Sequence, residues 1–240
     1  MAGSIAILMY HNISPRPPEG LVPWLYVPPA LFTSHMRILR RLGYRGLSMQ
    51  QAMPYLQGRR SGRVVAITFD DGYVDNLDNA LPVLVEFGFS ATCYVVSDCI
   101  GTYNQWDATD IKARKPLMNA GQLRQWTGAG MEIGSHTCRH PRLTQCSNDA
   151  LDRELRQSRG DIEQLLGGPV SHFCYPYGDV DARVAQAAGQ AGYSSAVTVQ
   201  RGRVRPRDDF MQLPRVRLAH YHGPLALAFK LLAPFEDRRH

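Results

Sequence analysis

Two adjacent carboxylates, Asp70 and Asp71, are the first residues whose type and spacing indicate chemistry. They follow the apolar segment 64–69 and precede Gly72, so both leave the end of a buried-type strand. Neighbouring carboxylates repel each other and are costly to remove from water, and a nearby cation offsets that cost. An Asp-Gly turn is the structural alternative, but a turn does not require two acids. One carboxylate is therefore expected to bind a metal ion while the other serves as a general base.

Two histidines, His136 and His140, supply the residue types that complete such a metal site. Their spacing suits two ligands on one helix face, but Pro141 disfavours helix at His140, and a loop is expected instead. Two ordinary surface histidines are the alternative. Two imidazoles and one carboxylate form an open catalytic set for Zn²⁺ or a similar ion, with positions left for water and substrate. We therefore expect one divalent metal ion, with zinc favoured and cobalt or nickel as alternatives.

The elements that must position these residues alternate between strand and helix. Strand patterns fall at residues 5–9, 64–69, 92–96, 131–134, 170–175 and 194–199, and helical patterns at 30–42, 48–57, 76–87, 120–127, 147–166 and 181–191. Such alternation predicts a mainly parallel sheet with helical crossovers, either open or closed into a barrel. His11, the two acids, the two histidines and the turn 175–178 each follow a strand. Because parallel strands end at one edge, these segments are expected to converge on one pocket.

Composition indicates one soluble globular domain spanning residues 1–240, with 44% hydrophobic and 20% charged residues. The net charge of +6 is most simply a basic surface that aids solubility; a preference for anionic glycans or lipid headgroups is the alternative. No nucleic-acid-binding motif is found, so no nucleic-acid partner is expected.

The N-terminus lacks the pattern of a signal peptide, and the five cysteines are odd in number with no CxxC pair. A cytoplasmic location, with membrane association as an alternative, is therefore expected. The protein is also expected to be a monomer. The apolar residues 225–232 predict either a helix covering one end of the domain, which is the commoner fate, or a peripheral membrane contact.

Three motifs in order resemble the polysaccharide deacetylases of carbohydrate esterase family 4: TFDDG at 68–72, SHTCRHP at 135–141 and YPYG at 175–178. LMYH at 8–11, ALP at 80–82 and GFSAT at 88–92 resemble the branch that contains the bacterial poly-N-acetylglucosamine deacetylases. The resemblance covers most of the chain. It implies an α/β fold, a distorted (β/α)7 barrel of the polysaccharide-deacetylase type.

The resemblance also implies roles for individual residues. Asp70 matches the catalytic base, and the metal triad is matched by Asp71, His136 and His140. Tyr177 matches the tyrosine whose backbone N–H helps stabilise the oxyanion. In this branch the motifs look circularly permuted, and His11 matches the histidine near the N-terminus that acts as general acid.

Two departures from the family pattern bear on these roles. Cys174 stands where the family often has an arginine that orients the base, and Arg215 is expected to supply that charge from another strand. His220 and His222 rival His11 as the general acid. We favour His11 because it follows a buried-type strand.

Trp106 and Tyr175 are expected to contact substrate, although loop packing is an equal alternative for Trp106. The expected activity is metal-dependent hydrolysis of N-acetyl groups from an amino-sugar glycan, whether polysaccharide, oligosaccharide or lipid-linked sugar, with release of acetate. The alternatives are a deformylase or other amidase acting on a lipid-linked aminosugar, and a non-catalytic glycan-binding protein on the same fold.

Overall fold

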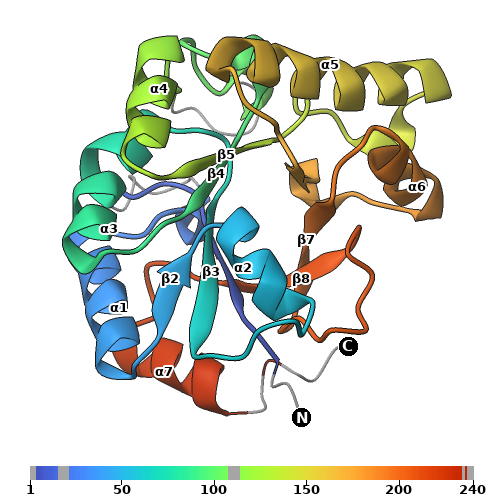
Figure 1. Cartoon of the computed structure of the whole chain (residues 1–240). Coiled ribbons are helices and arrows are strands. Elements are labelled where there is room, and N and C mark those ends of the chain that lie inside the picture. Colours follow the sequence, from blue (N-terminus) through green and yellow to red (C-terminus); the bar gives the residue numbers. More distant parts are fainter. Residues whose placement is uncertain (1–3, 16–21, 108–113, 234–235, 237–240) are drawn as a thin grey trace.

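A computed structural model describes residues 4–15, 22–107, 114–233 and 236, and its centre is a closed parallel barrel (Figure 1). The ring contains β1 (Ile7–Tyr10), β3 (Val64–Phe69), β4 (Thr92–Val95), β5 (Glu132–Ser135), β6 (His172–Cys174), β7 (Ser195–Arg201) and β8 (Leu213–Arg217). Its first strand pairs with both β3 and β8, and this double pairing closes the sheet. The predicted (β/α)7 barrel is thus confirmed, and the open sheet is not formed.

A short extra strand distorts the ring. β2 (Arg45–Leu47) pairs with residues 64–66 of β3, whereas β4 takes the same strand farther along, at Thr68 and Phe69. Sequence patterns missed β2 because it has three residues and a central glycine. A Cβ at Gly46 would lie 2.5 Å from the Ile67 side chain and 2.9 Å from that of Phe89, so the close packing requires glycine.

Helices surround the barrel in the predicted order. They are α1 (Pro29–Arg41), α2 (Met49–Leu56), α3 (Leu81–Phe87), α4 (Ala120–Gly128), α5 (Asn148–Leu166), α6 (Ala182–Gln190) and α7 (Pro224–Leu232). Residues 76–80, predicted as part of one helix with α3, form a π-helical segment that leads into it. Short 3₁₀ turns occur at Pro23–Leu25, Ser97–Cys99, Gln105–Asp107, Leu143–Gln145 and Pro176–Gly178.

Local sequence signals set several of the helix ends. Ser48 and Ser147 accept a backbone N–H at the first turns of α2 and α5, as N-cap residues do. Gly88 and Gly167 end α3 and α5 with φ of 63° and 71°, a conformation that glycine adopts without strain. These predicted starts and stops are confirmed.

The interior is packed at the end opposite the strand C-termini. The backbone N–H of Met49 donates to Thr92 and that of Gln50 to Glu132, so α2 begins at the N-terminal ends of β4 and β5. Met49 and Met53 then join an apolar cluster with strand residues such as Ile7. The strand C-termini are left as the end where polar side chains gather.

The apolar segment near the C-terminus forms α7, which packs against α1 (Figure 1). Leu227 and Leu231 are buried, whereas Leu225, Phe229 and Leu232 are 81%, 56% and 58% exposed. The helix therefore covers the fold on one side and presents an apolar stripe on the other. Within the described ranges no helix is long and apolar enough to cross a bilayer, and a peripheral membrane contact stays a prediction.

Candidate active site

A cavity of about 390 Å³ opens at the C-terminal ends of the strands. The structure brings eight of the nine predicted site residues into its wall: His11, Asp70, Asp71, Trp106, His136, His140, Tyr175 and Tyr177. The ninth, Arg215, lies directly behind Asp70 and is 1% exposed. Segments far apart in the sequence thus converge as the strand-end argument predicted.

Three side chains in the wall form a compact set of metal-competent atoms. Asp71 Oδ1 lies 3.4 Å from His136 Nε2 and 3.5 Å from His140 Nε2. The ligand atoms of all three residues lie within 4.8 Å of one another. Burial lowers the pKa of His140 to about 3, which keeps its imidazole neutral and able to coordinate.

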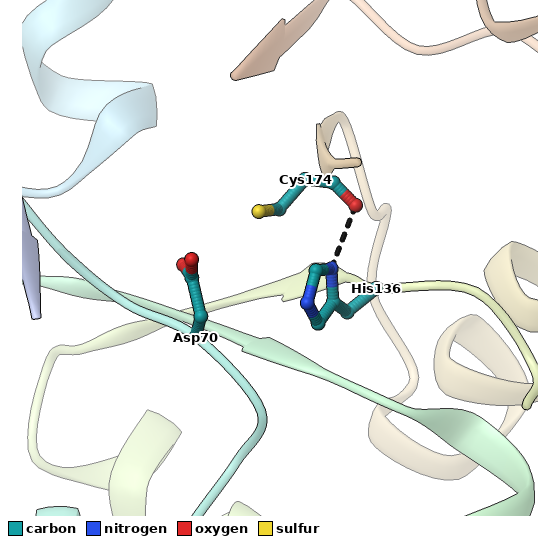
Figure 2. Close-up of side chains that lie close together, drawn as sticks. All are labelled: Asp70, His136 and Cys174. Atoms are coloured by element: carbon teal, nitrogen blue, oxygen red, sulfur yellow. Dashed lines mark hydrogen bonds between the residues drawn. The ribbon is translucent and has the colours of Figure 1, made fainter. Parts of the chain in front are cut away.

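The hydrogen bonds of His136 show that this set fits a cation. Its Nδ1 lies 2.7 Å from the backbone oxygen of Cys174, so Nδ1 carries the hydrogen and donates it (Figure 2). In the neutral ring, Nε2 then presents a lone pair to the Asp71 carboxylate. Burial lowers the pKa of His136, but its interactions with Cys174 and Asp71 outweigh burial and raise this pKa well above its ordinary value, so a positive charge is favoured at this position. Two acceptors that face each other repel, and a cation between them removes that repulsion. The residues present therefore fit a divalent metal ion.

A second grouping of metal-competent residues, Asp70, His136 and Cys174, is less suitable (Figure 2). Both oxygens of Asp70 already accept hydrogen bonds from Arg215. Burial raises the pKa of the Cys174 thiol, which keeps it protonated and a poor ligand. Asp71 is therefore the carboxylate of the metal set, and Asp70 is left for another task.

The backbone at this end of the barrel is locally strained. Within the described residues, the non-glycine residues with positive φ are Asp71 (77°), Thr137 (70°), His140 (61°) and Tyr177 (59°). Such conformations cost about 1–3 kcal/mol each and cluster at functional sites. His140 lies in a loop, as Pro141 predicted, and its N–H donates to Thr137 Oγ1 at 2.9 Å.

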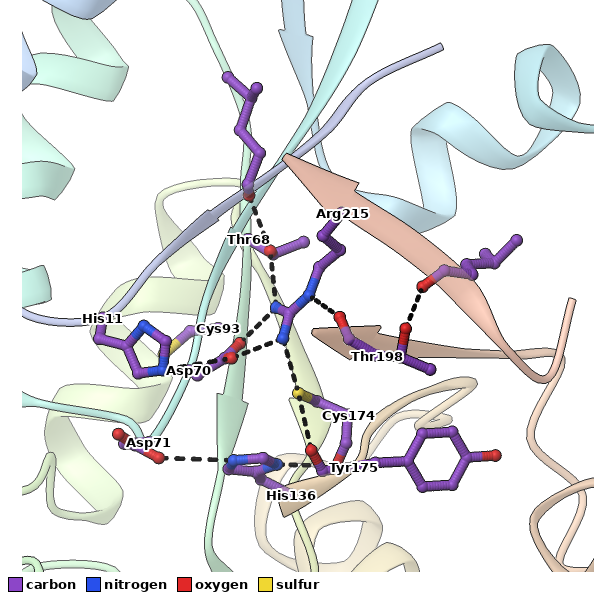
Figure 3. Close-up of polar contacts among 12 residues, drawn as sticks. His11, Thr68, Asp70, Asp71, Cys93, His136, Cys174, Tyr175, Thr198 and Arg215 are labelled. Atoms are coloured by element: carbon purple, nitrogen blue, oxygen red, sulfur yellow. Dashed lines mark hydrogen bonds and ion pairs between the residues drawn. The ribbon is translucent and has the colours of Figure 1, made fainter. Parts of the chain in front are cut away.

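Asp70 is held by a buried arginine. Arg215 donates from both terminal nitrogens to the two carboxylate oxygens, each at 2.7 Å (Figure 3). Its Nε donates to the Thr198 carbonyl at 2.8 Å, and one terminal nitrogen also reaches Thr68 Oγ1 at 3.2 Å. Burial alone would raise the pKa of Asp70, but Arg215 and His11 outweigh burial and hold this pKa well below its ordinary value. The carboxylate is therefore ionised and fixed in orientation.

His11 is the histidine placed beside this carboxylate. Its Nε2 lies 3.6 Å from Asp70 Oδ2, and burial lowers its pKa below the ordinary value. His220 instead pairs through Nδ1 with the Pro23 carbonyl, and His222 Nδ1 accepts the Ala219 N–H. Neither rival lines the main cavity.

Several known proteins resemble this chain. Residues 57–196 match the model of the polysaccharide deacetylase family. The protein named "Putative polysaccharide deacetylase YxkH" of Bacillus subtilis (strain 168) is 30% identical over 217 residues, which cover 90% of this chain and 71% of that protein. The chain belongs to the polysaccharide deacetylase family. The matched region contains Asp70, Asp71, His136, His140 and Tyr177, whereas His11 and Arg215 lie outside it.

Further proteins resemble this deacetylase in sequence or in fold. The poly-beta-1,6-N-acetyl-D-glucosamine N-deacetylase of Staphylococcus epidermidis is 22% identical over 193 residues, 79% of this chain and 66% of that enzyme. The solved structure of the Streptococcus pyogenes deacetylase PplD in complex with acetate gives a TM-score of 0.85 at 25% identity, and covers 96% of this chain and 99% of that one. IcaB from Ammonifex degensii gives 0.79 at 22% identity, covering 95% and 97%. The predicted family is confirmed, and the proteins that resemble this chain include members of the predicted branch.

Aromatic rings frame the metal set of the deacetylase. Trp106 stacks on His140 with ring centroids 4.5 Å apart, and Tyr177 meets the same imidazole edge to face at 4.6 Å. Tyr175 is 1% exposed, and its hydroxyl donates to the Met211 carbonyl. Trp106 therefore positions a metal-set histidine as well as lining the cavity, while Tyr175 has little surface left for a sugar.

Among the wall residues that sequence reasoning missed, Trp24 and Arg217 have the side chains best suited to contact a substrate. Trp24 falls in a proline-rich stretch without periodicity, so no sequence signal placed it. Arg217 had a usable signal, because it lies two residues after Arg215 on one strand and alternation puts both on the same face.

Proposed function

We propose that this deacetylase hydrolyses the N-acetyl group of an amino-sugar glycan, releasing acetate, with one divalent metal ion held by Asp71, His136 and His140. The observation that carries the proposal is the pairing of two sites in one cavity wall. Three metal-competent side chains lie next to a carboxylate that a buried arginine keeps ionised. A binding protein has no need of such a fixed, charged base.

A divalent ion in this kind of set lowers the pKa of a coordinated water and polarises a carbonyl, and zinc is the favoured ion. Asp70 is the residue placed to take the proton of the attacking water. Arg215 keeps that carboxylate deprotonated and aimed at the cavity while the rest of the barrel excludes water from behind it.

His11 is proposed to protonate the departing amine, which is otherwise a very poor leaving group. Asp70 Oδ2 lies 3.6 Å from His11 Nε2, so a proton accepted by the carboxylate has a short route to the histidine. The lowered pKa of His11 makes its protonated form a stronger acid toward the amine. Tyr177, in a strained turn beside His140, is proposed to face the oxyanion through its backbone.

The test is acetate release from N-acetylglucosamine oligomers by metal-stripped protein, with and without added Zn²⁺ or Co²⁺. We expect metal-dependent acetate that disappears in Asp70→Asn. Asp71→Asn should also lose bound metal. A matched control is Asp152→Asn, which removes an exposed carboxylate that pairs with Arg156 on α5 and should change neither metal content nor turnover.

Full activity without metal, or in Asp70→Asn, would refute these roles. Formate release from an N-formylated sugar with no acetate from N-acetylated ones would favour the deformylase alternative. Tight glycan binding with about one metal per chain and no turnover would favour a binding protein.

A further inference from the structure

Arg217 is a cation at the cavity mouth that the proposed chemistry does not use. Its guanidinium lies over the ring of Trp24, with Cζ 5.2 Å from the centroid. Among the residues that the structure describes, it has no carboxylate, carbonyl or hydroxyl partner. Trp24 in turn meets the imidazole of His11 edge to face, with centroids 6.0 Å apart. Trp24 therefore lies between the guanidinium of Arg217, which has no anionic partner among the described residues, and the proposed general acid His11.

The fold directs this side chain toward the substrate. Arg215 and Arg217 lie two residues apart on β8, so both project to the same side of the sheet. The first reaches Asp70 inside the barrel, and the second emerges one step farther along, at the strand end. Arg217 lines the main cavity, whereas Arg215 lies behind it.

A second cavity of about 250 Å³ adjoins the first and shares Val199 and Arg217 with it. The charged residues in its wall are Arg201, Arg215, Arg217, Lys230 and Glu236. Buried Glu236 pairs with both Arg201 and Lys230, at 2.7 and 2.6 Å, and Arg215 is neutralised by Asp70. Glu236 thus pairs with two of these cations, whereas no carboxylate among the described residues pairs with Arg217.

We propose that Arg217, stacked on Trp24, forms a subsite for an oxyanion, a phosphate or a carboxylate, that lies close to the acetamido group of the substrate, on the same sugar or on the next one. The inference rests on the proposed deacetylase function and names its substrate class as anionic N-acetylated glycans. A planar guanidinium held on an aromatic ring presents a preorganised fork to such a group, and little side-chain entropy is lost on binding.

The experiment measures acetate release from three probes: neutral chitotetraose, an oligosaccharide that alternates N-acetylglucosamine with glucuronate, and N-acetylglucosamine 1-phosphate. The last two separate a carboxylate source from a phosphate source. We expect kcat/KM to be higher for at least one anionic probe than for chitotetraose. Arg217→Gln should lower it for that probe by roughly 5- to 10-fold, mainly through KM, and leave chitotetraose unchanged.

A matched control is Arg45→Gln, because Arg45 also stacks on a tyrosine ring but lies at the N-terminal end of the barrel. It should change none of the three rates. Raising the ionic strength from about 0.05 to about 0.5 M should reduce the ratio of kcat/KM for the anionic probe to kcat/KM for chitotetraose in the wild-type protein. The same change should leave this ratio unaltered in Arg217→Gln.

Equal losses on all three probes in Arg217→Gln would overturn the oxyanion subsite and indicate a general structural role. Acetate from chitotetraose alone, or no preference among the probes, would also overturn it while leaving the deacetylase function intact. No acetate from any probe with metal-loaded protein would refute the deacetylase function itself, and the substrate inference with it.

Discussion

Replacing Arg215 with alanine tests whether this side chain keeps the proposed base, Asp70, deprotonated and correctly oriented. In the wild type this guanidinium makes two 2.7 Å hydrogen bonds to Asp70, and the two side chains are 0% and 3% exposed. Removing one partner of such a buried pair costs about 3–5 kcal/mol, because the remaining charge has no compensation. For a chain of this size, that loss lowers the melting temperature by roughly 10 °C.

The same substitution should move the pH dependence of turnover. Burial is the largest influence on the pKa of Asp70 and raises it, so without Arg215 this pKa rises above its ordinary value. A base must be deprotonated to act, and activity will therefore be lost as pH falls through the raised pKa. In the wild type, where the pKa is held far lower, that acid limb lies below the working range.

Three measurements decide the outcome: the pH profile of kcat/KM, the melting temperature and the bound metal. Metal content should stay unchanged because Asp71, His136 and His140 are untouched. The sulfur of Cys174 lies 3.4 Å from Arg215, so Cys174→Arg in the Arg215→Ala background offers a rescue from β6, which lies on the far side of β7. Wild-type turnover with an unshifted acid limb in Arg215→Ala would refute the reasoning.

Three further predictions concern other parts of the fold. His11→Ala should lower kcat by about 10²–10⁴-fold with metal retained, whereas His220→Ala, outside the cavity, should stay near wild type in the acetate assay. Burial lowers the pKa of His35 to about 4, so this side chain is protonated more readily in the unfolded chain. The free energy of unfolding should therefore fall as pH drops from about 6.5 to about 4, by at most about 3 kcal/mol. Denaturant titrations should show a flatter pH dependence in His35→Gln, and an equal slope would contradict this assignment. Gly178→Ala places a Cβ 2.8 Å from the Val199 backbone nitrogen at a residue whose φ is +68°, so it should reduce both the melting temperature and turnover. Gly168 has open space around its Cβ position, and Gly168→Ala should change neither quantity.

The sequence was sufficient for the parts of the fold that depend on local patterns. Segment 64–69 has the β-branched and apolar residues of a buried strand, and Ser147 and Gly167 frame α5 by simple capping chemistry. Strand-end polar residues also predicted the convergence of the site, because parallel topology fixes where those ends lie.

The features that the sequence did not predict depend on contacts between residues far apart in the chain. The pairing of β1 with β8 closes the barrel, and no local pattern distinguishes that from an open sheet. Trp24 enters the site through a segment without periodicity, and the short β2 is held by contacts of Gly46 with residues far along the chain. Tyr175 was predicted as a sugar contact from its motif, yet its burial depends on neighbours that the motif does not contain.

The position of Arg215 on the last strand of the ring has a consequence for synthesis of the chain. The metal set is complete by residue 140, but the counter-ion of Asp70 arrives some way after the other strands. A nascent chain that has not yet produced β8 has an open barrel edge along β1 and a carboxylate too costly to bury. We therefore expect hydrolytic competence and final closure to arise in the same folding event, so that chains ending before β8 are both inactive and sensitive to proteases.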